Sequence, residues 1–281
     1  MAEHPWSGIQ SRRLKELGAD PSMQQQLFDS PEARDRAFQG LERELVQGCR
    51  ERLEQLRRLR FRPRICGLES ALVEALGRRG FVQVATPTIM SKGLLARMSI
   101  GPDHPLSSQV YWLDGEHCLR PMLAPHLYFL LKDLLRLWEK PVRIFEVGSC
   151  FRKESRGSQH SSEFTMLDLV EMGLAQEARQ ERLEEWVALV ARAAGLRDYC
   201  LKEQKSAVYG QTVDILAGGR QIEVGSAAMG PHPLDLPWGI SEPWVGVGFG
   251  LERLLMASEG SASLKPWARS LAYLDGIRLN I

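Results

Sequence analysis

Two short segments of the chain carry side chains that could bind a nucleotide. The first reads FRKE, and its Arg152 and Glu154 point to the same face of an extended strand because they lie two residues apart. In the second, His160, Phe164 and Asp168 recur at a spacing of four residues. An arginine can neutralise a phosphate, a glutamate can accept from an exocyclic amine, and an aromatic ring can stack on a base. Together these residues predict an ATP site, although Arg152 and Glu154 alone would equally suit an exposed charged hairpin.

The elements that position these residues are predicted to be strands of an antiparallel sheet. Apolar runs at 144–147 and 164–167 flank a polar loop, which is the pattern of a hairpin with a long tip. Two more hairpins are predicted, at 109–119 and over 208–217 with 221–228. Because successive strands are neighbours in sequence, we expect an α+β fold, a mostly antiparallel sheet flanked by helices. Neither G-x-x-x-x-G-K-S/T nor a G-x-G-x-x-G that opens a helix is present, so bound ATP would lie on the sheet.

Residues 1–60 are predicted to form a helical appendage. Ser30 followed by Pro31 is a typical helix start. The end of this segment is dense in arginine, and Arg57, Arg58 and Arg60 are candidates for binding the phosphates of an RNA backbone. A solvated helix face is the alternative. Further amphipathic helices are predicted over residues 67–79, 125–138 and 177–194.

Composition limits the class of protein. The chain has 281 residues, of which 44% are hydrophobic and 25% charged, as in ordinary soluble enzymes. Its formal net charge is +1, so any affinity for nucleic acid must come from a local patch. We expect no membrane span and no signal peptide. The five cysteines are scattered without zinc-site spacing, which predicts reduced thiols in a cytoplasmic protein.

Three segments taken together resemble the signature motifs of class II aminoacyl-tRNA synthetases. The FRKE segment and the spaced His, Phe and Asp are similar to motif 2. Residues 79–87, a helix end and a strand closed by a proline, resemble motif 1. The run GVGFGLERLLM at 246–256 resembles motif 3. Each segment is weak alone, whereas their order and separations are hard to obtain by chance.

Longer matches identify the chain as a member of the pyrrolysyl-tRNA synthetases, with a resemblance over nearly its whole length. They are LRPMLAP (119–125), FRKES (151–155), EFTML (163–167), GFGLERLL (248–255) and ARSLAYLDG (268–276). The resemblance implies ATP-dependent activation of pyrrolysine, or a close lysine analogue, and its transfer to the 3′ end of a tRNA. It also implies a homodimer formed through motif 1. Residues 1–60 would be a tRNA-binding segment and 61–281 the catalytic domain. A separate N-terminal tRNA-binding protein, as some family members have, is left open.

The resemblance assigns roles to the nucleotide-binding residues. Arg152 would hold the α-phosphate and the substrate carboxylate, Glu154 would accept from the adenine amine, and His160 would reach the outer phosphates. The adenine would lie between Phe164 and Arg253. In addition, Glu223 and Ser226 would ligate the Mg²⁺ that accompanies ATP. Arg152, Glu154 and Arg253 are the predicted catalytic residues.

The resemblance also predicts a large apolar pocket for the amino acid. It would be lined by Ala124, Leu127, Tyr128, Leu131, Val170, Ala228 and Trp244, with Tyr209 as a lid. Two residues depart from the family pattern, because Asp168 and His126 stand where family members usually have Asn. Asp168 could donate as a protonated acid, accept from a substrate N–H, or pair with His126. Two alternatives remain: a class II synthetase for another bulky or lysine-like amino acid, and a synthetase-like protein that does not charge tRNA.

Overall fold

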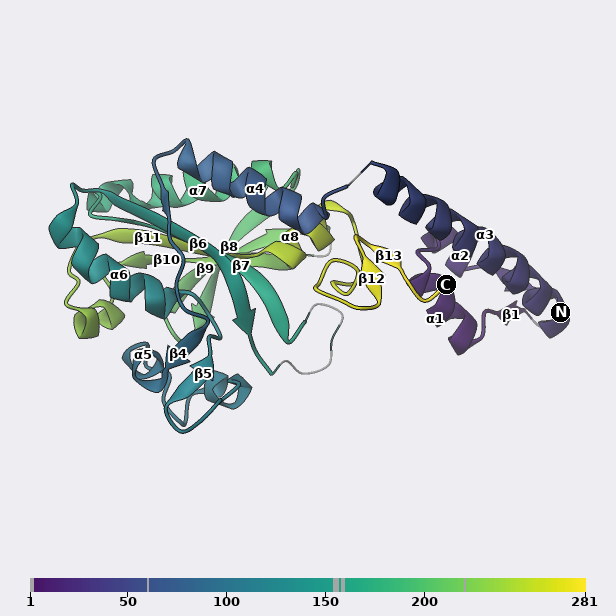
Figure 1. The fold of residues 1–281 in the computed structure, drawn as a ribbon, viewed down its shortest axis with the longest axis horizontal. Coiled ribbons are helices and arrows are strands. Elements are labelled where there is room, and N and C mark those ends of the chain that lie inside the picture. Colours follow the sequence, from purple (N-terminus) through teal and green to yellow (C-terminus); the bar gives the residue numbers. More distant parts are fainter. Residues whose placement is uncertain (1–2, 60, 154–156, 158–159, 220) are drawn as a thin grey trace. The chain divides into compact units, whose positions relative to one another are not determined.

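Figure 1 shows the chain as a computed structural model, which describes residues 3–59, 61–153, 157, 160–219 and 221–281. The chain divides into two compact units, one of residues 1–63 with 270–281 and the other of residues 64–269. The division into a tRNA-binding segment, 1–60, and a catalytic domain, 61–281, remains a prediction. Residues 270–281 cluster with the first unit in the structure.

The larger unit is built on a seven-stranded sheet. Six of its seven strands pair in antiparallel fashion, as the sequence predicts, and the short edge strand β3 pairs in parallel with β6. In spatial order the strands are β3 (Val82–Gln83), β6 (Val142–Phe151), β7 (Glu163–Met172), β11 (Trp244–Gly250), β10 (Ile222–Gly230), β9 (Gly210–Ala217) and β8 (Tyr199–Ser206).

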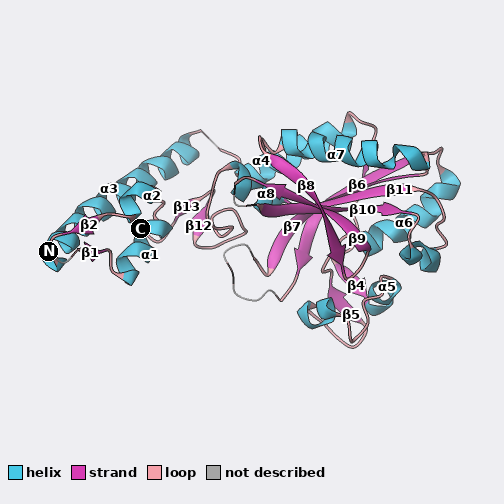
Figure 2. Cartoon of the chain, turned by 180° about the vertical axis from the view of Figure 1, so that it is seen from behind, coloured by secondary structure: helices cyan, strands magenta, loops and turns pink. Residues whose placement is uncertain are grey.

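Helices cover one face of this sheet and form the main core. They are α4 (Arg64–Gly77), α7 (Arg179–Ala193) and α8 (Leu251–Ser258). Apolar residues at helical spacing in α7, such as Leu183, Trp186 and Val190, are fully buried against the sheet. Figures 1 and 2 show α4 and α7 on one side of the sheet and the segment around β4 and β5 on the other.

The remaining elements of the larger unit connect these strands and helices. They are β4 (Ile89–Ser91), α5 (Lys92–Arg97), η1 (Pro105–Gln109), β5 (His117–Leu119), α6 (Ala124–Leu137), η2 (Gln176–Ala178), and η3 (Pro233–Trp238). The predicted hairpin at 109–119 is present in short form. Trp112 bridges Cys118 in antiparallel fashion, and the backbone N–H groups of Leu113 and Leu119 donate to the carbonyls of His117 and Tyr111, both at 2.9 Å. β5 also pairs with β4, a second partner that the sequence did not predict.

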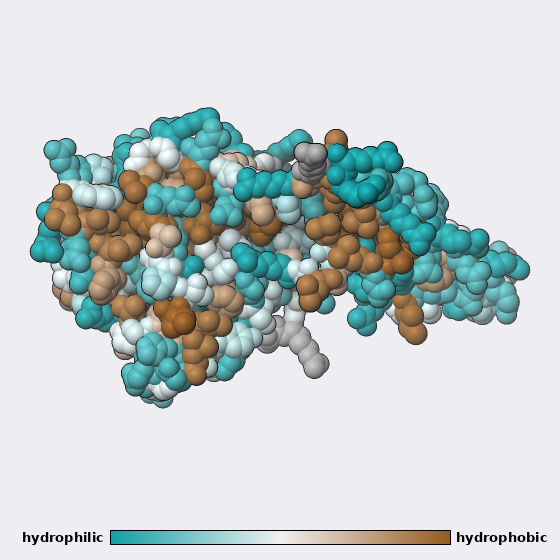
Figure 3. Space-filling view, viewed as in Figure 1, coloured by the Kyte–Doolittle hydropathy of each residue, from teal (hydrophilic) through white to brown (hydrophobic). Residues whose placement is uncertain are grey.

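The smaller unit is mostly helical. It comprises β1 (His4–Pro5), α1 (Gly8–Glu16), α2 (Pro21–Gln24), β2 (Leu27–Phe28), α3 (Pro31–Arg58), β12 (Tyr273–Leu274), and β13 (Ile277–Arg278). Ser30 caps α3 as predicted, accepting from the backbone N–H of Ala33 at 3.2 Å. Ile277 is buried with Leu17 and Cys49, which explains why the C-terminal residues belong to this unit. Figure 3 shows that hydrophilic residues cover most of α3 on the face in view. No helix among the described residues is long and apolar enough to cross a membrane.

Candidate active site

The centre of the site is the hairpin of β6 and β7, which the sequence predicts around the FRKE segment. β6 and β7 pair in antiparallel register from Val142–Met172 to Phe151–Glu163. Alternate residues of β7 point to opposite faces of the sheet. Leu167 and Leu169 are fully buried on the helix-covered side, whereas Phe164, Met166, Asp168 and Val170 line a cavity of about 680 Å³ on the other side.

A row of glycines in β11 forms the floor of this cavity beside β7. Gly246, Gly248 and Gly250 lie directly opposite Val170, Asp168 and Met166. The space above them is needed, because a Cβ on Gly248 would lie only 2.6 Å from Oδ1 of Asp168. Glycine is therefore the residue that lets β7 side chains lean over the neighbouring strand.

The end of the cavity near the start of β7 is charged. The Arg152 guanidinium lies 5.3 Å from the centroid of the Phe164 ring, and its Nε donates to the Pro121 carbonyl at 2.9 Å. Arg253 donates from NH1 to the Glu223 carbonyl at 3.1 Å and lies 3.5 Å from its carboxylate. Although Arg253 is expected opposite Phe164, it is Arg152 that covers the Phe164 ring in this structure. His160 also lines the cavity.

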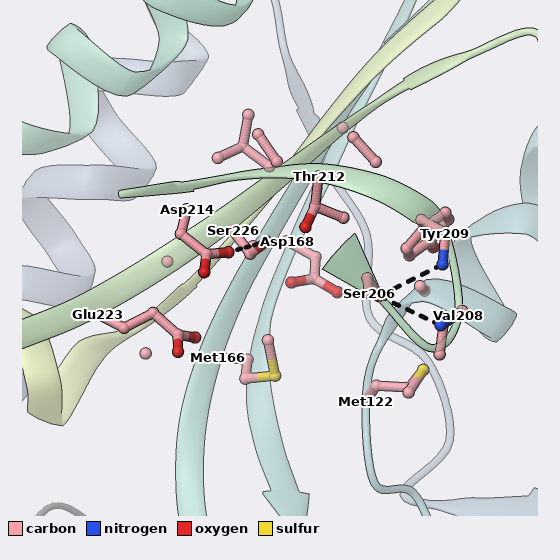
Figure 4. A pocket seen from close by; sticks show the side chains of 18 of the residues that line it. Met122, Met166, Asp168, Ser206, Val208, Tyr209, Thr212, Asp214, Glu223 and Ser226 are labelled. Atoms are coloured by element: carbon pink, nitrogen blue, oxygen red, sulfur yellow. Dashed lines mark hydrogen bonds between the residues drawn. The ribbon is translucent and has the colours of Figure 1, made fainter. Parts of the chain in front are cut away.

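Glu223 and Ser226 reach the same cavity through an irregularity of β10. Residues three apart in a regular strand point to opposite faces. The pairing of β10 with β9 shifts between Glu223 and Gly225, as in a β-bulge, and both side chains line the cavity. Ser226 donates to Asp214 Oδ1 at 2.9 Å, a bond drawn in Figure 4.

A buried carboxylate beside Arg253 connects the charged end to the sheet. Both carboxylate oxygens of Glu252 accept from the backbone N–H of Thr165, at 2.9 and 3.0 Å. Burial raises the pKa of Glu252 to about 7. This contact fixes the start of α8 against β7 and so positions Arg253, the next residue.

The opposite end of the cavity is apolar and aromatic. All the predicted pocket residues line this one cavity: Ala124, Leu127, Tyr128, Leu131, Asp168, Val170, Tyr209, Ala228 and Trp244. The Tyr128 hydroxyl donates to Asp235 at 2.9 Å, and Trp244 Nε1 donates to the other oxygen of Asp235 at 2.8 Å. Asp235 is buried in η3, so a single carboxylate orients both aromatic side chains.

Tyr209 comes from the turn between β8 and β9. The Ser206 hydroxyl accepts from the backbone N–H groups of Val208 and Tyr209, at 3.1 and 3.3 Å. The Tyr209 ring meets Trp244 at 6.2 Å between centroids and His232 at 5.9 Å. The turn therefore brings Tyr209 against the apolar end, where Figure 4 shows it beside Ser206 and Val208.

Asp168 lies between the two ends of the cavity. In the sheet it is opposite Glu146 of β6 and Gly248 of β11. Its Oδ1 is shut off from solvent and has no hydrogen-bond partner among the described residues. Burial raises its pKa to about 7. His126 does not pair with it, because the His126 Nδ1 lies 3.1 Å from the hydroxyl of Thr86.

The remaining predicted residues are not among those that line this cavity, and some are outside the described residues. Glu154 and Arg60 are outside the described residues. Arg57 and Arg58 are exposed on α3, and both pair with Glu54, at 2.7 and 2.9 Å. Among the described residues, no group of three or more His, Cys, Asp or Glu could hold a metal ion.

Sequence reasoning missed several residues of the site. Met166 could have been found, because it alternates with Phe164 and Asp168 on β7. No local signal marks Asp214 or Asp235, because the contacts that bring them to the site come from other elements.

Comparisons with known proteins identify the family. The model of class II tRNA synthetases (D, K and N) matches residues 49–194. The crystal structure of pyrrolysyl-tRNA synthetase from Desulfitobacterium hafniense is 54% identical, covers 99% of both chains, and superposes with a TM-score of 0.93. The chain belongs to the pyrrolysyl-tRNA synthetase family of class II aminoacyl-tRNA synthetases. A second structure of the synthetase from that organism gives 53% identity and a TM-score of 0.90, over 99% of this chain and 96% of that one.

This synthetase is also similar to lysine–tRNA ligases. The ligase of Moorella thermoacetica is 35% identical over 126 residues, which are 44% of this chain and 23% of the ligase. That of Thermoanaerobacter pseudethanolicus is 32% identical over 124 residues, 43% of this chain and 22% of the ligase. The matched segments are less than a quarter of these curated relatives.

Proposed function

We propose that this synthetase is a pyrrolysine–tRNA ligase, which activates pyrrolysine or a close lysine analogue with ATP and transfers it to tRNA. One observation carries the proposal. A single cavity joins a charged end, with Arg152, Phe164 and Arg253, to an apolar end deep enough for a long side chain. The 54% identity to the Desulfitobacterium hafniense enzyme over 99% of both chains supports the same activity.

The charged end suits ATP, which class II synthetases use together with Mg²⁺. Phe164 offers a ring face for the adenine, and Arg253, near the start of α8, lies 3.5 Å from the Glu223 carboxylate. Glu223 and Ser226 would hold Mg²⁺ through hard oxygens, and the ion would neutralise phosphate charge when bound. Glu154 would accept from the adenine amine, and His160 would contact the outer phosphates.

Activation joins the amino acid to AMP. An oxygen of the substrate carboxylate attacks the α-phosphorus, and pyrophosphate leaves. Arg152 would stabilise the negative charge that builds on the phosphoryl oxygens, because its guanidinium is held at the mouth of the charged end by the Pro121 carbonyl. The tRNA 3′-terminal hydroxyl then attacks the adenylate carbonyl, and AMP leaves.

The apolar end would bind the amino-acid side chain. Leu127, Leu131 and Trp244 provide a wall without charge, which suits an acylated lysine better than a short or charged side chain. Tyr209 would close over the bound side chain as a lid.

The assembly with other molecules is part of the same proposal. Val82, in the motif 1 region, and Ile89, two residues after that region, are 46% and 53% exposed, which supports a homodimer formed through this surface. The exposed arginines of α3 would contact tRNA in the cytoplasm, with or without a separate N-terminal tRNA-binding protein. Light scattering with and without tRNA tests the dimer, and a monomer at micromolar concentration would contradict it.

A lysine–tRNA ligase, or a synthetase for another bulky amino acid, is the second candidate. The 35% identity to the Moorella thermoacetica ligase favours it, but only over 126 residues. A protein that does not charge tRNA would leave both tRNAs uncharged, whether or not it shows pyrophosphate exchange.

ATP–pyrophosphate exchange distinguishes these functions. The purified protein is assayed with pyrrolysine, several Nε-acyl-lysines, lysine and the other standard amino acids, and charging of the pyrrolysine and lysine tRNAs follows. We expect exchange with pyrrolysine and acyl-lysines and charging of the pyrrolysine tRNA. Exchange with free lysine alone would support the second candidate.

A further inference from the structure

Asp168 is an acidic side chain in a place that offers little to stabilise its charge. It borders the cavity between Met166 and Val170, and Figure 4 shows its carboxylate in the midst of the labelled lining residues. Its Oδ1 has neither solvent nor a hydrogen-bond partner among the described residues. A buried polar atom in this condition costs free energy, and the cost is larger for a charged group.

The charged and titratable groups around Asp168 do not remove this cost. Burial has the largest effect and raises the pKa of Asp168, and Glu146 raises it further. Arg152, Arg120 and a hydrogen bond from the backbone N–H of Leu123 lower this pKa. Arg120 is already paired with Glu146 at 2.7 Å, in a bridge that is itself buried. Cys150 of β6 and Tyr209 of the β8–β9 turn also lie close enough to interact. The effect of burial is the largest, and the pKa of Asp168 rises to about 7.

A bound amino-acid side chain would bury Asp168 further. It would displace the solvent that still reaches the carboxylate from the cavity, and the walls on either side are apolar. An ionised carboxylate can only accept hydrogen bonds, so a substrate carbonyl would face it as a second acceptor. A neutral carboxylic acid instead donates one hydrogen bond, and it carries no charge to desolvate.

We propose that Asp168 binds the substrate as a neutral carboxylic acid, whose O–H donates to a side-chain carbonyl of the amino acid. Asp168 is then a specificity-determining residue, and the preferred substrate class is an ω-N-acylated amino acid with a carbonyl at this depth. Binding is coupled to the uptake of one proton above neutral pH. The inference rests on the proposed function, because it concerns the amino-acid end of the same cavity.

Calorimetry measures this coupling directly. Nε-acetyl-lysine is titrated into the full-length protein at pH 6.5 and 8.5, in pairs of buffers that differ in ionisation enthalpy. With the pKa of Asp168 near 7 in the free protein, we expect uptake of nearly one proton at pH 8.5 and an affinity roughly 25-fold weaker than at pH 6.5. Uptake near zero at pH 8.5, or equal affinity at both pH values, would overturn the proposal.

Asp168→Asn is the decisive variant, because its amide donates at every pH. We expect its affinity to be nearly independent of pH over this range, without proton uptake. Asp133→Asn makes the same chemical change on the exposed face of α6, where Asp133 pairs with Arg136 at 2.9 Å. This control should behave like the wild type. If Asp168→Asn keeps the pH dependence of the wild type, another group takes up the proton and the proposal is wrong.

A second substrate identifies the direction of the hydrogen bond. Nε-ethyl-lysine lacks the carbonyl and carries a cationic N–H group instead. A neutral Asp168 should bind it much more weakly than Nε-acetyl-lysine, whereas tighter binding would show an ionised acceptor and overturn the proposal.

The KM values in pyrophosphate exchange separate this inference from the proposed function. Exchange with a pH-independent KM for acyl-lysine contradicts the inference alone, whereas no exchange with any amino acid contradicts both.

Discussion

The two ends of the cavity share one floor and differ in what surrounds it. β7 and the glycines of β11 run under both. At one end, β6 and α8 contribute Arg152 and Arg253, while at the other, α6 and β11 contribute Leu131 and Trp244. The sheet therefore supplies a common surface, and the elements at its margins decide which part of a substrate binds where. This separation predicts that a change at one end should affect the kinetics of one substrate more than those of the other.

The largest effect is expected at the charged end. Arg152→Ala removes the guanidinium that would oppose the developing charge at phosphorus, and such losses reduce rates by about 100- to 1000-fold. Pyrophosphate exchange measures the rate, and circular dichroism checks the fold. Arg136→Ala, on the exposed face of α6, is the control and should retain full activity. Wild-type exchange in a folded Arg152→Ala variant would refute the assignment of this end to ATP.

The apolar end should respond in KM for the amino acid. Asp235→Ala removes the acceptor of Tyr128 and Trp244 and leaves both donors without it. Hydrogen bonds to a charged group are worth about 1.5–3 kcal/mol each, so we expect KM for the amino acid to rise by roughly 10-fold or more. KM for ATP should change little. An equal rise in both KM values would mean that the two ends are not separable.

Asp168, between the two ends, should affect the pH dependence of the free energy of unfolding. The pKa of Asp168 is about 7 in the folded protein and near 3.8 when unfolded, so the folded state holds a proton that the unfolded state releases between these values. The stabilising contribution of the protonated Asp168 to the folded protein is therefore fully present below pH 4 and is lost as the pH rises to 7. Asp168→Asn should therefore gain on the wild type by up to about 1.4 kcal/mol per pH unit over this window. Urea unfolding at pH 5 and pH 7 measures the difference, and a gap that does not grow would contradict the raised pKa.

The smallest effect is expected on α3, in the other compact unit. Replacing Arg57 and Arg58 together by Ala on α3 should weaken tRNA charging by a few-fold at moderate salt and reduce the salt dependence of tRNA binding. Because both arginines already share Glu54, their loss should cost less than that of two unpaired arginines. Pyrophosphate exchange should be unchanged. A matching fall in exchange would indicate a structural role for these arginines.

The sequence predicted the parts of the site that obey local periodicity. Alternation along β7 placed Phe164 and Asp168 on one face, and Ser30 with Pro31 marked the start of α3. The residues of the amino-acid pocket came from the family resemblance, because helical or strand periodicity does not distinguish pocket residues from other buried apolar residues. The roles assigned to these residues remain predictions that the variants above test.

The features that escaped prediction depend on contacts between distant segments. The family resemblance brought Glu223 and Ser226 together, but the register shift of β10 that places both side chains at the cavity was not predicted, because a shift of one residue does not change the composition. Turn chemistry indicated the local partner of β5 but gave no sign of β4, which pairs with β5 across about thirty residues. The C-terminal residues join the first unit through the burial of Ile277 against Leu17, a contact between opposite ends of the chain.

Substitutions in the glycine floor, Gly246, Gly248 and Gly250, can change the depth of the cavity in one direction only. A methyl group on Gly250 would meet Arg253 at an ordinary 3.8 Å, one on Gly246 would press on Trp244 at 3.1 Å, and one on Gly248 would collide with Asp168. Glycine has no side chain left to remove, so substitutions of these three glycines can only make the site shallower. A redesign for a longer or wider amino acid must instead trim the walls contributed by α6 and by the turn that carries Tyr209.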